Sequence, residues 1–274
     1  MIERRVRAGG VNHRLVQGDC VEFLMRDDTV YDVVVTSPPY NVGTTYGRYD
    51  DKGSRLDYLD WCHAWLAAIA ERLAGDGSFF LNVGGVPSDP MGPFDVAQAA
   101  RQYFEFQNII VWVKSIAVPG DKTEVVHGHY QPINSPRYLN ACHEYIFHLT
   151  RSGSVSLDRL SIGVPYKDSA NKSRWRSAGD VHCRGNAWFL PYDTIQLKER
   201  DRPHPASFPL SLPATCIRLH GISKIRSVLD PFAGIGTVAA ACASLGVPST
   251  SCEIEPSFLE IAEERLVKSA AANP

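Results

Sequence analysis

The segment Thr36-Ser37-Pro38-Pro39-Tyr40 constrains the fold of this chain more than any other part of the sequence. It follows Tyr31 to Val35, a short apolar and β-branched run of the kind that forms a strand buried on both faces. The two prolines have fixed φ angles and no amide donors, so the chain is held extended at Ser37 and Pro38. The result is a rigid corner at the carboxyl end of a strand. Ligands of open α/β sheets bind at that edge.

The corner carries one hydroxyl, one free carbonyl and one aromatic ring. The Ser37 hydroxyl and the Pro38 carbonyl can each accept a hydrogen bond from an NH₂ group, while the ring of Tyr40 stacks on the heterocycle that bears it. The segment therefore suits a planar amine as its ligand. A plain turn from strand to loop is the alternative, and the tetrapeptide alone does not decide between the two.

The length and composition of the chain favour a cytoplasmic α/β protein. With 274 residues, 44% of them hydrophobic, the chain can bury a core as one large domain or as a domain with an insertion. It has no apolar run of about 18 residues and its first residues are charged, so neither a membrane span nor a signal peptide is expected. Seven cysteines without a C-x-x-C pair indicate free thiols in a reducing compartment, and no metal site is expected.

The charge is unevenly distributed along the chain. The net charge is −2 overall, but residues 151–203 carry a net charge of +4. A basic block of this kind is where a phosphate backbone would bind, and a solvated basic loop region is the alternative.

Periodicity predicts an alternation of strands and helices interrupted by irregular stretches. Strands are expected at 15–20, 31–37, 78–83, 106–113, 143–150, 226–230 and 250–253, and helices at 57–73, 94–103, 210–220, 237–245 and from 256 onward. Asp57 is the expected N-cap of the first long helix. Residues 1–14 are expected to form a lead-in arm. Residues 41–56, 115–140 and 151–203 are expected to be largely irregular.

A second candidate site lies near the end of the chain, where residues 228–245 form a strand, a glycine turn and a helix. Gly234 and Gly236 would let the backbone approach a ligand at the helix N-terminus. Glu253, at the end of the next strand, can accept hydrogen bonds from both hydroxyls of a ribose. This combination favours an adenosyl-type cofactor. Asp19, also at a strand end, could accept from an adenine amino group, or it could cap the short helix that follows.

These segments together resemble amino-directed DNA methyltransferases that use S-adenosylmethionine. Asp230 to Thr237 resembles the cofactor motif, with Ile235 as a mild departure, and Ser37 to Tyr40 resembles the catalytic motif. Three further segments that match the family are Gly18-Asp19-Cys20, His143-Glu144-Tyr145-Ile146 and His204 to Pro209. The matches span residues 15–150 and 204–266. The catalytic motif comes first, which resembles the circularly permuted β class.

The resemblance implies an α/β, Rossmann-like methyltransferase fold with a mostly parallel seven-stranded sheet and helices on both faces. Residues 1–150 would be the catalytic part, residues 204–274 the cofactor-binding part of the same domain, and residues 151–203 the target-recognition region. The implied catalytic residues are Ser37, Pro38, Pro39 and Tyr40. The implied cofactor-binding residues are Asp19, Cys20, Thr36, Pro205, Phe208, Asp230, Phe232, Ala233, Gly234, Gly236, Thr237 and Glu253. Candidate DNA contacts are Arg48, Lys52, Arg55, Lys114, Lys172, Arg174, Arg176 and Arg184.

The activity implied is transfer of a methyl group to the N4 amine of a flipped cytosine in duplex DNA. Serine in the first position of the catalytic motif favours cytosine N4, whereas aspartate or asparagine favours adenine N6, which stays the alternative. Double-stranded DNA is the expected partner, with a homodimer and a cognate restriction endonuclease as further candidates, in the cytoplasm of a prokaryote beside the nucleoid.

Two rival functions fit the sequence less well. Methyltransferases that act on glutamine in release factors, and some RNA methyltransferases, use a similar corner but place the glycine motif before it. A non-catalytic DNA-binding relative would need neither the corner nor the glycine turn, and both are intact here.

Overall fold

The computed structural model describes residues 1–46, 49–51, 53–118, 125–128, 135–167, 180–191 and 208–272. Within these residues nine strands form one sheet, in the order β1-β2-β15-β14-β3-β6-β10-β7-β13. The strands are β1 (Ile2–Ala8), β2 (Val11–Gln17), β3 (Tyr31–Thr36), β6 (Leu73–Val83), β7 (Glu105–Val113), β10 (His143–Thr150), β13 (Ala187–Phe189), β14 (Val228–Asp230) and β15 (Ser249–Glu253).

The centre of the sheet is parallel, and antiparallel pairs occur on either side of it. Strands β2, β15, β14, β3 and β6 run parallel to one another. β10 lies antiparallel between β6 and β7, and β1 is antiparallel to β2. The expected count of seven strands is wrong for this sheet, because β1 and β13 extend it at its two edges. The sheet is therefore mixed.

The expected lead-in arm at residues 1–14 is instead a β-hairpin. Gly9 and Gly10 have φ angles of +57° and +78°, which allow a tight two-residue turn between β1 and β2. Side chains on one face of the hairpin, including Val6 and Leu15, pack in a small core against Leu259 and other residues from the end of the chain. The short alternation of apolar residues in this segment is a weak local signal for a strand, because the residues that complete its apolar face lie far along the chain.

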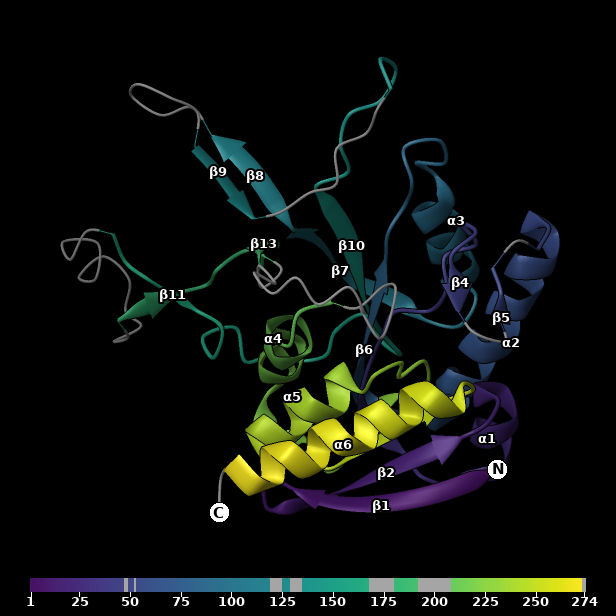
Figure 1. Ribbon diagram of the computed structural model, residues 1–274. Helices are drawn as coiled ribbons and strands as arrows, with labels where there is room; N and C mark the ends of the chain where they lie inside the picture. The colour runs from purple at the N-terminus through teal and green to yellow at the C-terminus, as the bar shows by residue number, and fades with distance from the viewer. Residues whose placement is uncertain are drawn as a thin grey trace.

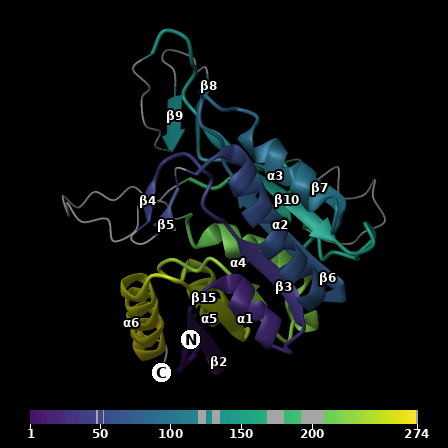
Figure 2. The same ribbon diagram turned by 90° about the vertical axis from the view of Figure 1, so that its right-hand side faces the viewer.

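Helices cover both faces of the sheet, as expected. One face carries α1 (Cys20–Arg26), α2 (Arg55–Arg72) and α3 (Gly92–Ala100), which lie in front in Figure 2. The other face carries α4 (Ser211–His220), α5 (Thr237–Leu245) and α6 (Pro256–Ala272), with a short 3₁₀ turn, η2 (Ile222–Lys224), after α4. Strand β3 is buried along its length. Val34 faces the core beneath α1, α2 and α3, and Val33 and Val35 face the core beneath α4 and α5.

The long helix α2 begins slightly before its expected start. Ser54, not Asp57, is its N-cap, because the Ser54 hydroxyl accepts a hydrogen bond from the Asp57 amide at 3.2 Å. The Asp57 carboxylate accepts in return from the Ser54 hydroxyl at 2.7 Å. This reciprocal pair places Asp57 in the first turn, where a carboxylate also complements the helix dipole.

The stretches expected to be irregular contain short strands. Three small two-stranded sheets pair β4 (Thr45–Tyr46) with β5 (Tyr49–Asp50), β8 (Ser115–Val118) with β9 (Val125–Gly128), and β11 (Val164–Pro165) with β12 (Val181–His182). The β8–β9 hairpin projects away from the body of the molecule (Figure 1). Strand β13 pairs in parallel with β7, so part of residues 151–203 belongs to the main sheet. In the described part of the chain, no helix is long and apolar enough to cross a membrane.

Candidate active site

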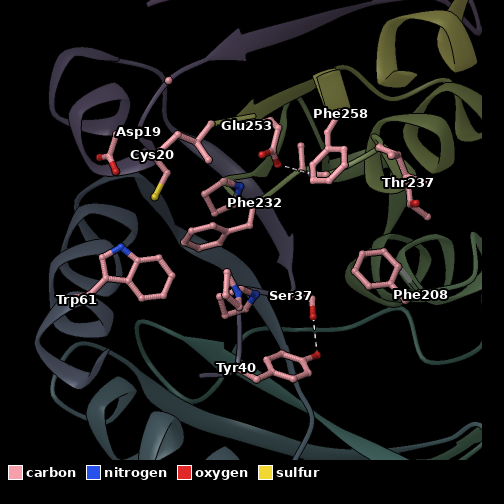
Figure 3. A pocket seen from close by; sticks show the side chains of 18 residues that line it. Asp19, Cys20, Ser37, Tyr40, Trp61, Phe208, Phe232, Thr237, Glu253 and Phe258 are labelled. Atoms are coloured by element: carbon pink, nitrogen blue, oxygen red, sulfur yellow. Dashed lines mark hydrogen bonds between the residues drawn. The ribbon is translucent and has the colours of Figure 1, made fainter. Parts of the chain in front are cut away.

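One pocket brings together residues from the two ends of the sequence (Figure 3). It lies at the carboxyl ends of the adjacent parallel strands β2, β15, β14 and β3, where the loops that follow these strands meet. Its walls are formed by Gly18, Asp19, Cys20, Ser37, Pro38, Pro39, Tyr40, Trp61, Phe208, Pro231, Phe232, Ala233, Gly234, Ile235, Thr237, Glu253, Ile254 and Phe258. The diproline corner and the glycine turn therefore share one cavity, as the sequence predicts.

Glu253 is held in place at this pocket by two backbone amides. Its Oε2 accepts from Gly234 at 2.7 Å and its Oε1 accepts from Glu255 at 2.9 Å. Burial raises the pKa of the Glu253 carboxyl above its usual value. Each carboxylate oxygen has two acceptor positions, so each keeps one for a ligand. A carboxylate arranged in this way fits the two hydroxyls of a ribose.

Asp19 caps a helix and also faces the pocket. Its Oδ1 accepts from the amides of Val21 and Glu22 at 2.9 and 3.0 Å, so the capping role considered from the sequence is confirmed. Among the described residues its Oδ2 makes no hydrogen bond, which leaves an acceptor for a ligand amine. The neighbouring Cys20 is a neutral wall of the pocket, because burial raises the pKa of its thiol.

Aromatic side chains contribute apolar surface to the pocket. Phe208, Phe232 and Phe258 surround it, with Trp61 closing one side (Figure 3). The ring of Trp61 meets that of Phe232 at a centroid distance of 5.4 Å in an edge-to-face arrangement. Trp61 and Phe258 were not predicted from the sequence. The helical spacing of Trp61 within α2 was the only available signal, and it does not reveal which elements α2 packs against.

Three predicted cofactor residues lie behind the pocket instead of lining it. Thr36 and Asp230 are buried and bonded to each other, with the Thr36 hydroxyl donating to Asp230 Oδ1 at 2.7 Å. Burial raises the pKa of the Asp230 carboxyl to about 7. Gly236 precedes α5 with a φ of +73°, and a Cβ there would lie 2.7 Å from the Cβ of Ala262. These residues position the pocket walls.

The diproline corner is braced from α2 and by its own tyrosine. The Tyr58 hydroxyl donates to the Pro39 carbonyl at 2.8 Å. The Ser37 and Tyr40 hydroxyl oxygens are 2.6 Å apart and hydrogen-bonded. After the corner the loop is tied to the buried Asp51, whose carboxylate accepts from the amides of Asn41, Val42 and Thr44. The corner is therefore rigid on both sides.

Two of the predicted DNA contacts form ion pairs within the protein. Arg55 is engaged within the protein by Asp89 and Asp95, and Lys114 forms an ion pair with Glu144 at 2.9 Å. Both cations are thus committed to internal carboxylates. Arg184 is partly exposed in the segment between β12 and β13. The remaining predicted residues, Arg48, Lys52, Lys172, Arg174, Arg176 and the cofactor residue Pro205, lie outside the described residues.

The sequence of the chain is similar to those of known type II methyltransferases. The chain is similar to the type II methyltransferase M.ScaI of Streptomyces caespitosus, with 28% identity over 92% of this chain and 80% of M.ScaI. It is also similar to the type II methyltransferase M.HpaI of Haemophilus parainfluenzae, with 26% identity over 93% of this chain and 74% of M.HpaI.

Two solved structures share the fold. The PvuII DNA methyltransferase, which is cytosine-N4-specific, has a TM-score of 0.66 at 18% identity, covering 93% of this chain and 86% of its own. TTHA0409 of Thermus thermophilus, solved in complex with S-adenosyl-L-methionine, has a TM-score of 0.60 at 24% identity, covering 94% of each chain.

The sequence match to a known family spans most of the chain. It covers residues 31–264, which include the diproline corner, the glycine turn and Glu253. The resemblance to amino-directed DNA methyltransferases that was stated from the motifs is thereby confirmed. The protein therefore belongs to the N6_N4_Mtase family of DNA methylases.

Proposed function

We propose that this DNA methylase transfers its methyl group to the exocyclic N4 amine of a cytosine flipped out of duplex DNA. The observation that carries the proposal is the shared pocket. Glu253 and the glycine turn form one end of it, and the Ser37–Pro38 corner forms the other. A cofactor held at the first end would present its reactive group to an amine held at the second.

The residues at the cofactor end suit an adenosyl group. The Glu253 oxygens would accept from the ribose hydroxyls and Asp19 Oδ2 from the adenine amine, while Trp61, Phe232 and Phe258 would exclude water from the rings. Bound S-adenosylmethionine supplies a methyl group already activated by a positively charged sulfur. The remaining task of the protein is to prepare the nucleophile.

The diproline corner performs that task by accepting hydrogen bonds. An exocyclic amine is a poor nucleophile because its lone pair is delocalised into the ring. Acceptors at Ser37 Oγ and the Pro38 carbonyl would favour a pyramidal nitrogen and direct its lone pair at the methyl group. The ring of Tyr40 would stack on the flipped base. After transfer the nitrogen is cationic and strongly acidic, so its proton can pass by way of the Ser37 hydroxyl to solvent water, and no strong base is needed.

Two observations favour cytosine over adenine. The first residue of the corner is serine, and the structurally similar PvuII enzyme is cytosine-N4-specific. Adenine N6 offers the same NH₂ group and stays the alternative, because the corner binds only that group. Binding of the duplex is assigned to the basic segment 151–203. Of the candidate DNA contacts in this segment, Arg184 lies among the described residues. A homodimer and a cognate restriction endonuclease stay predictions.

The test is to identify the methylated product. The protein is incubated with methyl-labelled S-adenosylmethionine and mixed-sequence duplex DNA, the DNA is digested to nucleosides, and the product is identified by mass. We expect N4-methylcytosine. N6-methyladenine would overturn the assignment of the base and leave the mechanism intact. Duplex binding without any label in the DNA would overturn the enzymatic function in favour of a non-catalytic DNA-binding protein.

A further inference from the structure

A network of polar side chains lies directly behind the diproline corner. Tyr40 of the corner meets Asn82 at the end of β6 and Glu144 in β10, and Lys114 approaches from the end of β7. The Tyr40 hydroxyl is 3.1 Å from Glu144 Oε2, and Asn82 Nδ2 is 2.8 Å from that hydroxyl and 2.7 Å from the same carboxylate oxygen. The network reaches the reacting edge through the 2.6 Å contact between Tyr40 and Ser37.

Lys114 sets the hydrogen-bond direction at the far end of the network. Its ammonium group has donors only, and it contacts Glu144 Oε1 at 2.9 Å. The side chains of Lys114 and Glu144 are only 17% and 13% exposed, so the ion pair is shielded from water. Glu144 in this pair is a carboxylate, which accepts hydrogen bonds and donates none.

The carboxylate in turn fixes the orientation of Asn82. The amide must turn its NH₂ group toward Glu144, because its carbonyl oxygen would be repelled there. Asn82 Oδ1 is consequently buried without a hydrogen-bond partner among the described residues. An unpaired buried acceptor is unfavourable, so its presence indicates that the orientation is imposed by the neighbouring charge.

These two constraints decide which hydroxyl donates at the corner. Tyr40 has one proton, and it goes to Glu144, because the carboxylate can only accept. The Tyr40 oxygen then accepts, from Asn82 and from Ser37. The short contact between Ser37 and Tyr40 is therefore donated by Ser37. One lone pair of the Ser37 oxygen faces Asn82 Nδ2 at 3.3 Å, and the other is left available to the pocket.

We infer that Glu144 is a positioning residue that makes Ser37 an acceptor toward the target amine, acting through Tyr40. The inference rests on the proposed function and deepens it. If position 144 could donate a hydrogen bond to Tyr40, the tyrosine proton could turn to Ser37. The serine proton could then point into the pocket, where it would oppose the N–H groups of the substrate.

Glu144→Gln tests this directly, because glutamine has the shape of glutamate and carries an NH₂ group. We expect the single-turnover rate of methyl transfer to fall roughly 100-fold, the scale of losing one preorganised hydrogen bond at a reacting centre. The dissociation constants for S-adenosylmethionine and duplex DNA should stay within about twofold. Glu71→Gln, an exposed carboxylate in α2, is the matched control and should retain the wild-type rate.

A double-mutant cycle separates this role from a merely structural one. Tyr40→Phe keeps the aromatic ring but removes the connection between Glu144 and Ser37, so it should lower the rate at least about tenfold. Adding Glu144→Gln to Tyr40→Phe should then cost little more, because the two residues act as one unit. If Glu144 only anchors Lys114, the two losses should multiply. Multiplying losses would overturn the inference.

Other outcomes are equally informative. A wild-type rate in Glu144→Gln, or in Tyr40→Phe should the first variant fail to fold, would overturn the positioning role and leave the methylase function standing. The positioning role would also be overturned if Glu144→Gln lowered the melting temperature and weakened S-adenosylmethionine binding by the same factor as the rate of methyl transfer. A wild-type protein that transfers no methyl group to DNA would instead overturn the proposed function, and the inference with it.

Discussion

Thr36 donates its hydroxyl proton to Asp230 across 2.7 Å, joining two strand ends that are 194 residues apart in the sequence. Thr36 directly precedes the diproline corner, and Asp230 directly precedes the loop that contains the glycine turn. The same Asp230 oxygen also accepts from the Phe232 amide at 3.1 Å. One buried carboxyl group therefore sets the distance between the two ends of the pocket.

This buried carboxyl should make stability depend on pH. Burial raises the pKa of Asp230 from 3.8 to about 7, so between these values the folded protein holds a proton that the unfolded chain releases. The contribution to stability is full below about pH 4 and is lost as pH rises through 7. Asp230→Asn lacks this titration and should gain stability relative to wild type by a few kcal/mol over that range, since one pKa unit is about 1.4 kcal/mol. Urea unfolding of both proteins at several pH values measures the difference, and parallel curves would contradict the prediction.

Ser37→Ala should affect turnover far more than cofactor binding. The serine oxygen accepts from the target amine in the proposed mechanism and lies at the end of the pocket away from Glu253. We expect the rate of methyl transfer to fall by about 100-fold or more, with the dissociation constant for S-adenosylmethionine nearly unchanged. Single-turnover kinetics and calorimetry provide the two measurements. Ser152→Ala, at an exposed serine, is the control. Equal losses in rate and affinity would argue against the assigned role.

Glu253→Ala should weaken cofactor binding. Removing the carboxylate removes the acceptors for the ribose hydroxyls and also leaves the amides of Gly234 and Glu255 without their partner. A charge-assisted hydrogen bond is worth about 1.5–3 kcal/mol, so we expect the dissociation constant for S-adenosylmethionine to rise roughly 10- to 100-fold. Calorimetric titration measures it, with the exposed Glu264→Ala in α6 as control. An unchanged constant would remove Glu253 from the cofactor site.

Gly236→Ala should destabilise the fold for two separable reasons. The residue has a φ of +73°, and an added Cβ would lie 2.7 Å from that of Ala262. The left-handed backbone costs about 1–2 kcal/mol for a non-glycine residue, and overpacking adds about 1–3 kcal/mol. Gly10→Ala has a similar φ of +78° with no atom within 4 Å of its Cβ, so it should show the backbone cost alone. Urea unfolding compares the two variants, and equal losses would show that the Ala262 contact is unimportant.

Local sequence patterns were sufficient for several central features. Consecutive β-branched residues indicated a fully buried β3, because a strand covered by helices on both faces has no polar side. Prolines and glycines indicated the rigid corner and the turn before α5, because these residues restrict or widen backbone freedom regardless of context. Glu253 was predicted as a cofactor residue because it is an acidic residue at the end of a predicted strand.

Long-range packing accounts for what local patterns did not reveal. The hairpin β1–β2 was missed because its apolar face is completed by α6, more than 200 residues later. The ion pair of Lys114, a predicted DNA contact, was not foreseen, because a lysine in a sequence carries no sign of its partner and Glu144 reaches it only through the pairing of β10 with β7. Trp61, Phe258 and Asn82 were likewise not predicted as part of the site, because long-range packing brings them there. Backbone preferences act within a few residues, whereas burial, hydrogen-bond direction and charge pairing depend on elements that meet after folding.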